Sequence, residues 1–164
     1  MSIYLGMDPG QSGALCVLDT ITKVHTFHDT PGGSNSPNAV FCWIMAQYHL
    51  NNEIHFIGIE DVHSIHGTSA KSNFNFGFNV GVLHAIADIT QIGFDLIKPK
   101  EWQKVVGVPT QKPKTAPAVR KKAIAAVALR LYPTALLYGP RGGLLDGRAD
   151  ALMIAHYLSI KYGK

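Results

Sequence analysis

Two acidic residues each end an apolar run, and their positions suggest a shared site. Asp8 follows an apolar run at residues 2–7, and Glu60 closes a second one at residues 54–60. If these runs are neighbouring parallel strands, both carboxylates emerge at the carboxyl edge of one sheet. Open α/β sheets bind their ligands at that edge, so we expect a functional site there.

Two further acids, Asp146 and Asp150, are four residues apart in a predicted C-terminal helix, so they share one helical face. Carboxylates that converge repel one another, and they persist only when a cation neutralises them or some stay protonated. Hard oxygen ligands select Mg²⁺ or Mn²⁺ over zinc. Paired ions of this kind catalyse phosphodiester hydrolysis. The acids together predict a hydrolytic site with two divalent ions.

Each acid taken alone has a simpler interpretation. An acid after a strand is usually a turn residue, and Asp146 by itself is most simply a helix N-cap. Asp150 alone could be a solvated helix residue, although its neighbours in Ala149–Leu152 are apolar. The set as a whole favours metal binding.

The order of the predicted elements is typical of an α/β protein with a mixed sheet. The first three strands form an antiparallel meander, and a crossover helix then places the fourth strand parallel to the first. We expect strands at residues 2–7, 13–18, 23–28, 54–60 and 94–97, and helices at 37–50, 76–90, 118–132 and 146–162.

Three segments carry a family resemblance. Residues 6–13 (GMDPGQSG) resemble the first motif of RuvC-type Holliday junction resolvases, including the small phage-encoded ones. Residues 57–62 (IGIEDV) are similar to the second acidic motif of that family, and residues 146–155 (DGRADALMIA) to its C-terminal acidic helix. Basic segments at 98–102 and 120–123 fall where the family has a basic connector, so the resemblance covers nearly the whole chain.

The resemblance implies a ribonuclease H-like fold with a five-stranded sheet flanked by helices. It also implies a homodimer that cleaves symmetric strands of a four-way DNA junction, because two active sites must cut two strands. We take the helix predicted at 76–90 as the candidate dimer interface.

The resemblance further assigns Asp8, Glu60 and Asp150 as metal ligands. Many members carry another ligand three residues before the last aspartate, where this chain has Gly147. Asp146 lies one residue earlier and is our candidate for that role. In this hypothesis Asp8 contacts both ions, Glu60 and Asp150 each hold one, and Asp146 completes the shell or orients a water.

One quarter of the chain is strongly basic, as a DNA-binding surface requires. Its lysines and arginines are Lys98, Lys100, Lys104, Lys112, Lys114, Arg120, Lys121 and Lys122. The alternative for these residues is an ordinary solvated helix face. An acidic metal site that binds a polyanion, however, needs positively charged side chains around it. We take Lys112, Lys114, Arg120 and Lys121 as DNA-binding candidates, and one of the lysines could stabilise charge on the scissile phosphate. His63 is a candidate for base stacking, with a plain loop position as the alternative.

The other aromatic residues are expected to be structural. Phe74, Phe76 and Phe78 are predicted to be core or dimer-contact residues rather than base stackers. Trp43 and Trp102 are predicted to anchor the core.

Length and composition bound the class of protein. The 164 residues suit one domain, and a hydrophobic content of 46% spread along the chain excludes wholesale disorder. Cys16 and Cys42 show no metal spacing and are expected to be reduced, as in a cytoplasmic protein of a bacterium or phage-infected cell. No apolar run reaches the roughly 20 residues that span a bilayer.

Three other functions remain open. Sugar kinases and other actin-like ATPases begin with a similar Asp-x-Gly-x-Ser-Gly turn, but they enclose a nucleotide between two domains. A nuclease of the same fold could act on RNA or on branched DNA more broadly. A DNA-binding module without catalysis is the last alternative.

Overall fold

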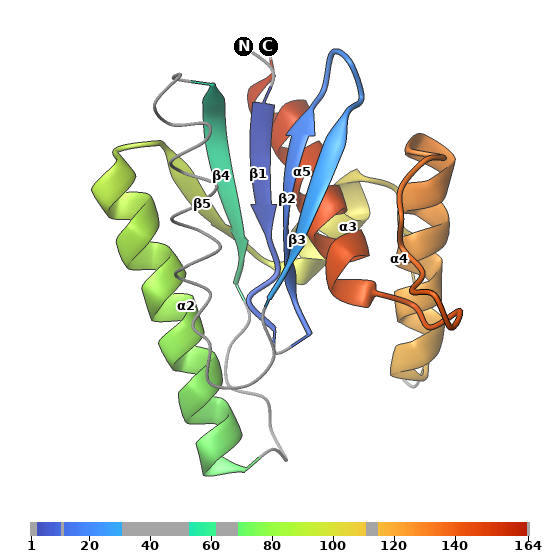
Figure 1. Cartoon of the computed structure of the whole chain (residues 1–164), viewed down its shortest axis with the longest axis horizontal. Coiled ribbons are helices and arrows are strands. Elements are labelled where there is room, and N and C mark those ends of the chain that lie inside the picture. The colour runs from blue at the N-terminus through green and yellow to red at the C-terminus, as the bar shows by residue number, and fades with distance from the viewer. Residues whose placement is uncertain (1–2, 11, 31–52, 62–68, 111–114, 164) are drawn as a thin grey trace.

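The structure is a computed structural model that describes residues 3–10, 12–30, 53–61, 69–110 and 115–163. These residues form a five-stranded sheet in the order β3-β2-β1-β4-β5 (Figure 1). The strands are β1 (Ile3–Met7), β2 (Ala14–Asp19), β3 (His25–Asp29), β4 (Ile54–Glu60) and β5 (Phe94–Ile97). The first three strands pair antiparallel, whereas β4 is parallel to β1 and β5 is parallel to β4. The predicted mixed sheet is confirmed.

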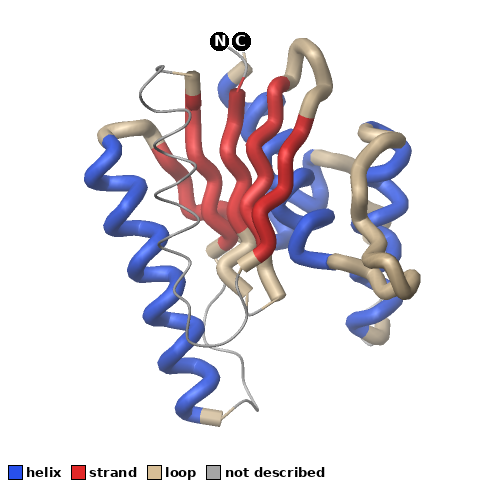
Figure 2. Tube along the Cα trace, viewed as in Figure 1, coloured by secondary structure: helices blue, strands red, loops and turns tan. Residues whose placement is uncertain are grey.

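Helices cover both faces of the sheet. Figure 2 shows one long helix on one side of the strands and the remaining helices on the other. The single helix is α2 (Ala70–Thr90), and the opposite layer contains α3 (Pro99–Val105), α4 (Pro117–Leu131) and α5 (Asp146–Tyr162). The helix predicted at 37–50 lies outside the described residues.

The strands bury alternate side chains on opposite faces. Leu5 and Met7 of β1 lie in a cluster with Leu83 and Ala87 of α2. Tyr4 belongs to the other cluster, in which α5 supplies more buried residues than any other element. Both faces of β1 are thus covered, which explains why its sequence is apolar throughout rather than alternating.

Small residues allow α5 to lie directly on the sheet. A Cβ at Gly6 would lie 2.1 Å from the carbonyl oxygen of Ala151, so only glycine fits where β1 crosses the helix. A Cβ at Gly58 would lie 2.8 Å from Ile154 Cγ2. This close approach brings the first turns of α5 to the edge at which β1 and β4 end.

Two helices differ from the sequence-based expectation. α2 begins at Ala70, six residues before the predicted start, because the Ser69 side chain caps it by accepting from the Ser72 amide at 3.1 Å. The short helix α3 was not predicted, although Pro99 stands at its first turn, where proline is favoured. No helix among the described residues is long and apolar enough to span a membrane.

Candidate metal site at the carboxyl ends of β1 and β4

Asp8 and Glu60 leave the sheet side by side. Met7 is paired in register with Ile59, so the next residue of each parallel strand is one of the two acids. By alternation Asp8 shares the face of Tyr4 and Gly6, which α5 covers. The turn after β1 is held by hydrogen bonds from the Asp8 amide to Ala14 O and from the Gly10 amide to Asp8 Oδ1, both 2.9 Å long.

Glu60 is a charged side chain buried in the core, with 7% of its surface exposed. Its strand is fixed on the far side by β5, where Glu60 is in register with Ile97 and the Asp61 amide donates to Ile97 O at 2.8 Å. The indole Nε1 of Trp102 in α3 donates a hydrogen bond to Glu60 Oε1 at 3.0 Å. The Trp102 side chain is fully buried, as predicted, but its polar contact was missed.

The start of α5 brings Asp146 and Asp150 to the same edge. The helix begins at Asp146 with Leu145 as the capping residue, so the predicted N-cap role of Asp146 is wrong by one position. The physical reason is that the Asp146 side chain forms an ion pair with Lys121 of α4 rather than capping the helix. Asp146 instead places a negative charge in the first turn, where the helix dipole favours it.

Gly147 stands three residues before Asp150, where the resemblance described above implies a metal ligand. A Cβ at this position would lie 2.3 Å from Ser12 O and 2.7 Å from Gly13 Cα. The first turn of α5 therefore presses against the loop that follows Asp8, and residue 147 has no room for a side-chain ligand. Asp146, the residue directly before Gly147, is the nearest acid in the sequence to this contact.

Arg148, inside the same motif, points away from the acids and anchors the helix. It donates to both carboxylate oxygens of Asp29 at 2.6 and 2.7 Å, and to Leu136 O at 3.0 Å. A bidentate pair of this kind fixes orientation as well as distance. Arg148 thereby ties the first turn of α5 to the edge strand β3.

The four carboxylates interact electrostatically. Burial is the main cause that raises the pKa of Asp8 to about 6, with the Asp146 charge adding to it. Burial and the Asp8 charge raise the pKa of Glu60 to about 7, while the Trp102 hydrogen bond acts in the opposite direction. The pKa of Asp150 is raised by burial and by all three other acids. Asp150 is therefore the residue that links the set.

Lys121 is the positive charge of this cluster. Its hydrogen bond to Asp146 is the main cause that raises the pKa of the ammonium group, and the charges of Asp150 and Asp8 act in the same direction. The sequence placed Lys121 among the DNA-binding candidates, and the structure brings it to the acids. Arg120, its neighbour in α4, is exposed.

The donor set fits a divalent cation of the Mg²⁺ or Mn²⁺ type. Oδ1 of Asp150 is buried without a hydrogen-bond partner, and such an atom is stabilised when a cation binds it. Among the described residues, no three His, Cys, Asp or Glu side chains are already arranged as a complete metal site. Carboxylates repel one another without an ion between them, so a full ligand set requires these side chains to turn toward a shared cation.

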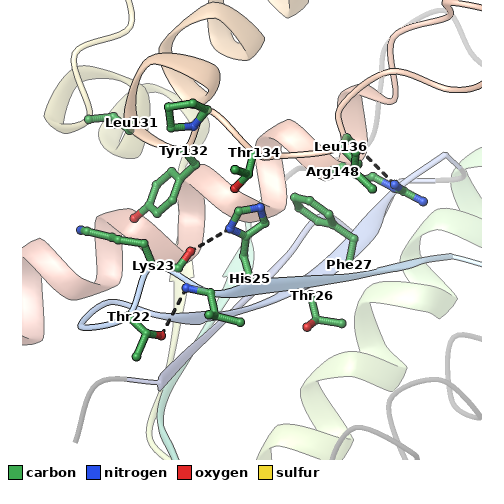
Figure 3. Close-up of a pocket in the computed structure, with 12 residues that line it drawn as sticks. Thr22, Lys23, His25, Thr26, Phe27, Leu131, Tyr132, Thr134, Leu136 and Arg148 are labelled. Carbon is green, nitrogen blue, oxygen red and sulfur yellow. Dashed lines mark hydrogen bonds between the residues drawn. The ribbon is translucent and has the colours of Figure 1, made fainter.

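One pocket among the described residues lies away from these acids. It has a volume of about 740 Å³ and is lined by the β2–β3 turn, β3, the segment after α4 and Arg148 (Figure 3). None of the four acids lines it. A second pocket, of about 300 Å³, borders one of the four acids, because Asp146 lines it together with Ser12, Gly13 and Thr30.

Several sequence-based candidates are not placed at this site. His63, Lys112, Lys114 and Trp43 lie outside the described residues. Phe74 and Phe78 of α2 are 74% and 56% exposed, so the prediction that they belong to the core of this chain is wrong. The buried cluster includes Leu83 and Ala87 of α2 but neither Phe74 nor Phe78. Their role as dimer contacts stays a prediction.

The fold is similar to that of RuvC from Thermus thermophilus. A structure of that protein in complex with a Holliday junction substrate superposes with a TM-score of 0.66 at 12% identity, over 98% of this chain and 96% of the other. A second structure of T. thermophilus RuvC gives a TM-score of 0.63 at 14% identity, with the same coverage. No family model matches the sequence, and no curated protein is similar to it in sequence. The similarity shows a RuvC-like, ribonuclease H-like fold.

Proposed function

We propose that this protein is a divalent-metal-dependent endonuclease that resolves four-way DNA junctions. The observation that carries the proposal is the meeting of Asp8, Glu60, Asp146 and Asp150 at one sheet edge. This acidic edge belongs to a fold whose solved neighbours include RuvC bound to a Holliday junction substrate. Hydrolysis of a phosphodiester by two metal ions uses a ligand set of this composition.

In this proposal the chain supplies the ligands and their geometry. Asp8, Glu60 and Asp150 hold the ions, and Asp146 completes the shell or orients a water. The backbone amide of Gly10 orients the Asp8 carboxylate by donating to its Oδ1. Two bound divalent ions supply the Lewis acidity that phosphodiester hydrolysis needs.

The substrate class follows from charge. An acidic site repels DNA unless cations surround it, and Lys121 stands beside Asp146 with half of its side chain exposed. We propose that Lys121 releases Asp146 when metal binds and then contacts the phosphate that is cut. The exposed Arg120 extends this positive surface along α4, and Lys112 and Lys114 are further candidates.

A homodimer is part of the proposal, because a symmetric junction is cut on two strands. The exposed Phe74 and Phe78 are four residues apart on α2 and share one face. Gly77 and Gly81 meet nothing within 4 Å of their Cβ positions, so a second helix can approach closely there. We propose this part of α2 as the dimer contact.

Synthetic four-way junctions and linear duplexes of the same arms test the function, each with magnesium and with EDTA. We expect symmetric cuts only in the junction, and only in the reactions that contain magnesium. Asp8→Asn should abolish cleavage and keep junction binding, whereas Asp88→Asn, at an exposed acid of α2, should leave both unchanged. Cleavage that survives Asp8→Asn unaltered would contradict the metal mechanism.

The same assays separate the alternatives. Equal cutting of flaps, forks or RNA indicates a broader nuclease of this fold. Junction binding without metal-stimulated cutting indicates a binding module. Magnesium-dependent ATP binding would favour an actin-like ATPase. One observation argues against the ATPase. The superposition with RuvC in complex with its junction covers 98% of this chain and 96% of the RuvC chain.

A further inference from the structure

Trp102 has a contact that a residue packed only for its bulk does not need. Its indole N–H, on α3, donates to Oε1 of Glu60, which is 42 residues away in the sequence. The donor side chain is fully buried and the acceptor is 7% exposed, so water does not replace either partner easily. An indole N–H only donates and carries no charge. It therefore orients the carboxylate and leaves most of its lone pairs for a cation.

The short helix α3 is fixed where this contact requires it. β5 ends at Ile97, Lys98 is the N-cap position, and Pro99 starts the helix, so Trp102 follows the end of β5 by about one turn. The hydrogen bond from the Asp61 amide to Ile97 O holds the ends of β4 and β5 together immediately beside Glu60. The backbone on both sides of the Trp102–Glu60 contact is thus determined by the sheet.

α3 is also tied to the helix that carries the other acids. Glu101, next to Trp102, accepts a hydrogen bond from the hydroxyl of Tyr157 in α5. Glu101 also lies 3.8 Å from the ammonium group of Lys161. Tyr157 is seven residues after Asp150, which is two turns along the same face of α5. Through α3, the acid of β4 is therefore held in fixed relation to the helix that bears Asp150.

We propose that Trp102 is a positioning residue that holds the Glu60 carboxylate in the orientation needed to bind a divalent ion. The inference rests on the proposed function, because it assumes that Glu60 is a metal ligand. Partners that hydrogen-bond to metal ligands commonly contribute about 10–100-fold to metal affinity. Deleting the N–H of Trp102 should therefore weaken metal binding by that order while the fold persists.

The first measurement is Mn²⁺ binding by calorimetry and by electron paramagnetic resonance, without DNA. The test variant is Trp102→Phe. The matched control is Tyr132→Phe, which deletes one buried hydrogen-bonding group of the same core, the hydroxyl that pairs with His156 Nδ1 at 2.9 Å. We expect Mn²⁺ affinity to fall about 10–100-fold in Trp102→Phe and to stay unchanged in Tyr132→Phe. Cleavage by Trp102→Phe should recover as the metal concentration is raised.

A second variant separates the N–H from the bulk of the ring. In a Trp43→Phe background, Trp102 is the remaining tryptophan, so feeding benzothienylalanine replaces the N–H by sulfur at nearly constant shape. The same background allows Mn²⁺ to be followed by quenching of Trp102 fluorescence. We expect quenching in the tryptophan protein and weakened Mn²⁺ binding in the benzothienyl protein.

The outcomes distinguish the two proposals. If the unsubstituted protein binds Mn²⁺ and cleaves, and both Trp102 variants bind Mn²⁺ equally well, the positioning role is wrong and the nuclease stands. Mn²⁺ binding that leaves Trp102 fluorescence unchanged would also overturn the inference. If the unsubstituted protein binds no divalent ion, the proposed function fails and the inference fails with it.

Discussion

The ammonium group of Lys121 forms an ion pair with the carboxylate of Asp146, so a lysine of α4 stands against the acids of α5. The charges of Asp150 and Asp8 also act on Lys121. In the metal-free protein this lysine partly neutralises carboxylates that otherwise repel one another. The relationship gives Lys121 two roles: without DNA it competes with the cation for Asp146, and under the proposed function it contacts the phosphate that is cut.

Replacing Lys121 by methionine separates these roles. Metal affinity without DNA should rise, by up to about fivefold, because exposed ion pairs are worth up to about 1 kcal/mol. Junction cleavage should fall, because the proposed phosphate contact is lost. Calorimetry with Mn²⁺ and single-turnover cleavage measure the two effects. Lys122→Met is the control, since Lys122 is exposed on the same helix and should change neither.

Gly147 should not accept a side chain, not even an aspartate, which would place a carboxylate three residues before Asp150. In Gly147→Asp the Cβ meets Ser12 O at 2.3 Å, so α5 must move away from the loop after Asp8. We expect a loss of about 1–3 kcal/mol in the free energy of unfolding, as for other overpacked positions, together with weaker metal binding. Urea unfolding followed by circular dichroism measures the stability.

The control for this change is Gly143→Ala, because a Cβ at Gly143 would meet nothing within 4 Å. Its stability should stay within about 0.5 kcal/mol of the parent, as for ordinary surface substitutions. A Gly147→Asp protein of unchanged stability and raised metal affinity would contradict the geometry of the first turn of α5.

The raised pKa values of the acids predict how stability depends on pH without metal. Folding raises the pKa of Asp8 to about 6 and that of Glu60 to about 7, mainly by burial, so the folded state holds these protons more tightly than the unfolded state. The acids therefore stabilise the metal-free protein less as pH rises from about 4 to about 7. A tenfold difference in proton affinity between the folded and unfolded states corresponds to about 1.4 kcal/mol. Magnesium should reverse the trend, because it binds the deprotonated carboxylates.

Urea unfolding at pH 5 and pH 8, with EDTA and with magnesium, checks this prediction. His156 acts in the opposite sense, since burial lowers its pKa and its contribution grows as pH rises. Comparison with Asp150→Asn separates the contribution of the acids from that of His156, because this variant removes the carboxylate whose charge interacts with the other three acids. Asp150→Asn should be more stable than the parent at pH 8 without metal, and magnesium should stabilise it less. A parent protein that loses no stability relative to Asp150→Asn between pH 5 and pH 8 would refute the account.

The proposed dimer contact predicts a change in mass. Phe74→Glu with Phe78→Glu places charges on the exposed face of α2 and should convert a dimer to a monomer. Light scattering after size exclusion measures the mass. In the monomeric variant the two strands of a junction should no longer be cut together. Ile89→Glu, which alters another exposed apolar residue near the opposite end of α2, is the control. A parent protein that is already monomeric at micromolar concentration would reject the interface.

Much of this fold is determined by local sequence patterns. The apolar runs predict β1, β2 and β4 within one residue, because a strand buried on both faces must be apolar along most of its length. The last helix is predicted at its observed bounds, Asp146–Tyr162, because its small and apolar residues recur with helical spacing. The sequence also predicts the candidate acids, because two of them directly end an apolar run and the other two share one face of the last helix.

The tertiary structure alone decided the contacts between those elements. The hydrogen bond from Trp102 to Glu60, the ion pair of Lys121 with Asp146 and the closeness of Gly147 to Ser12 join residues that no periodicity relates. Periodicity reports which face of an element is buried, because burial repeats with the pitch of the helix or strand. It does not report which partner a buried polar group meets, because that depends on how separate elements pack, and here α5 packs directly on the glycine of β1.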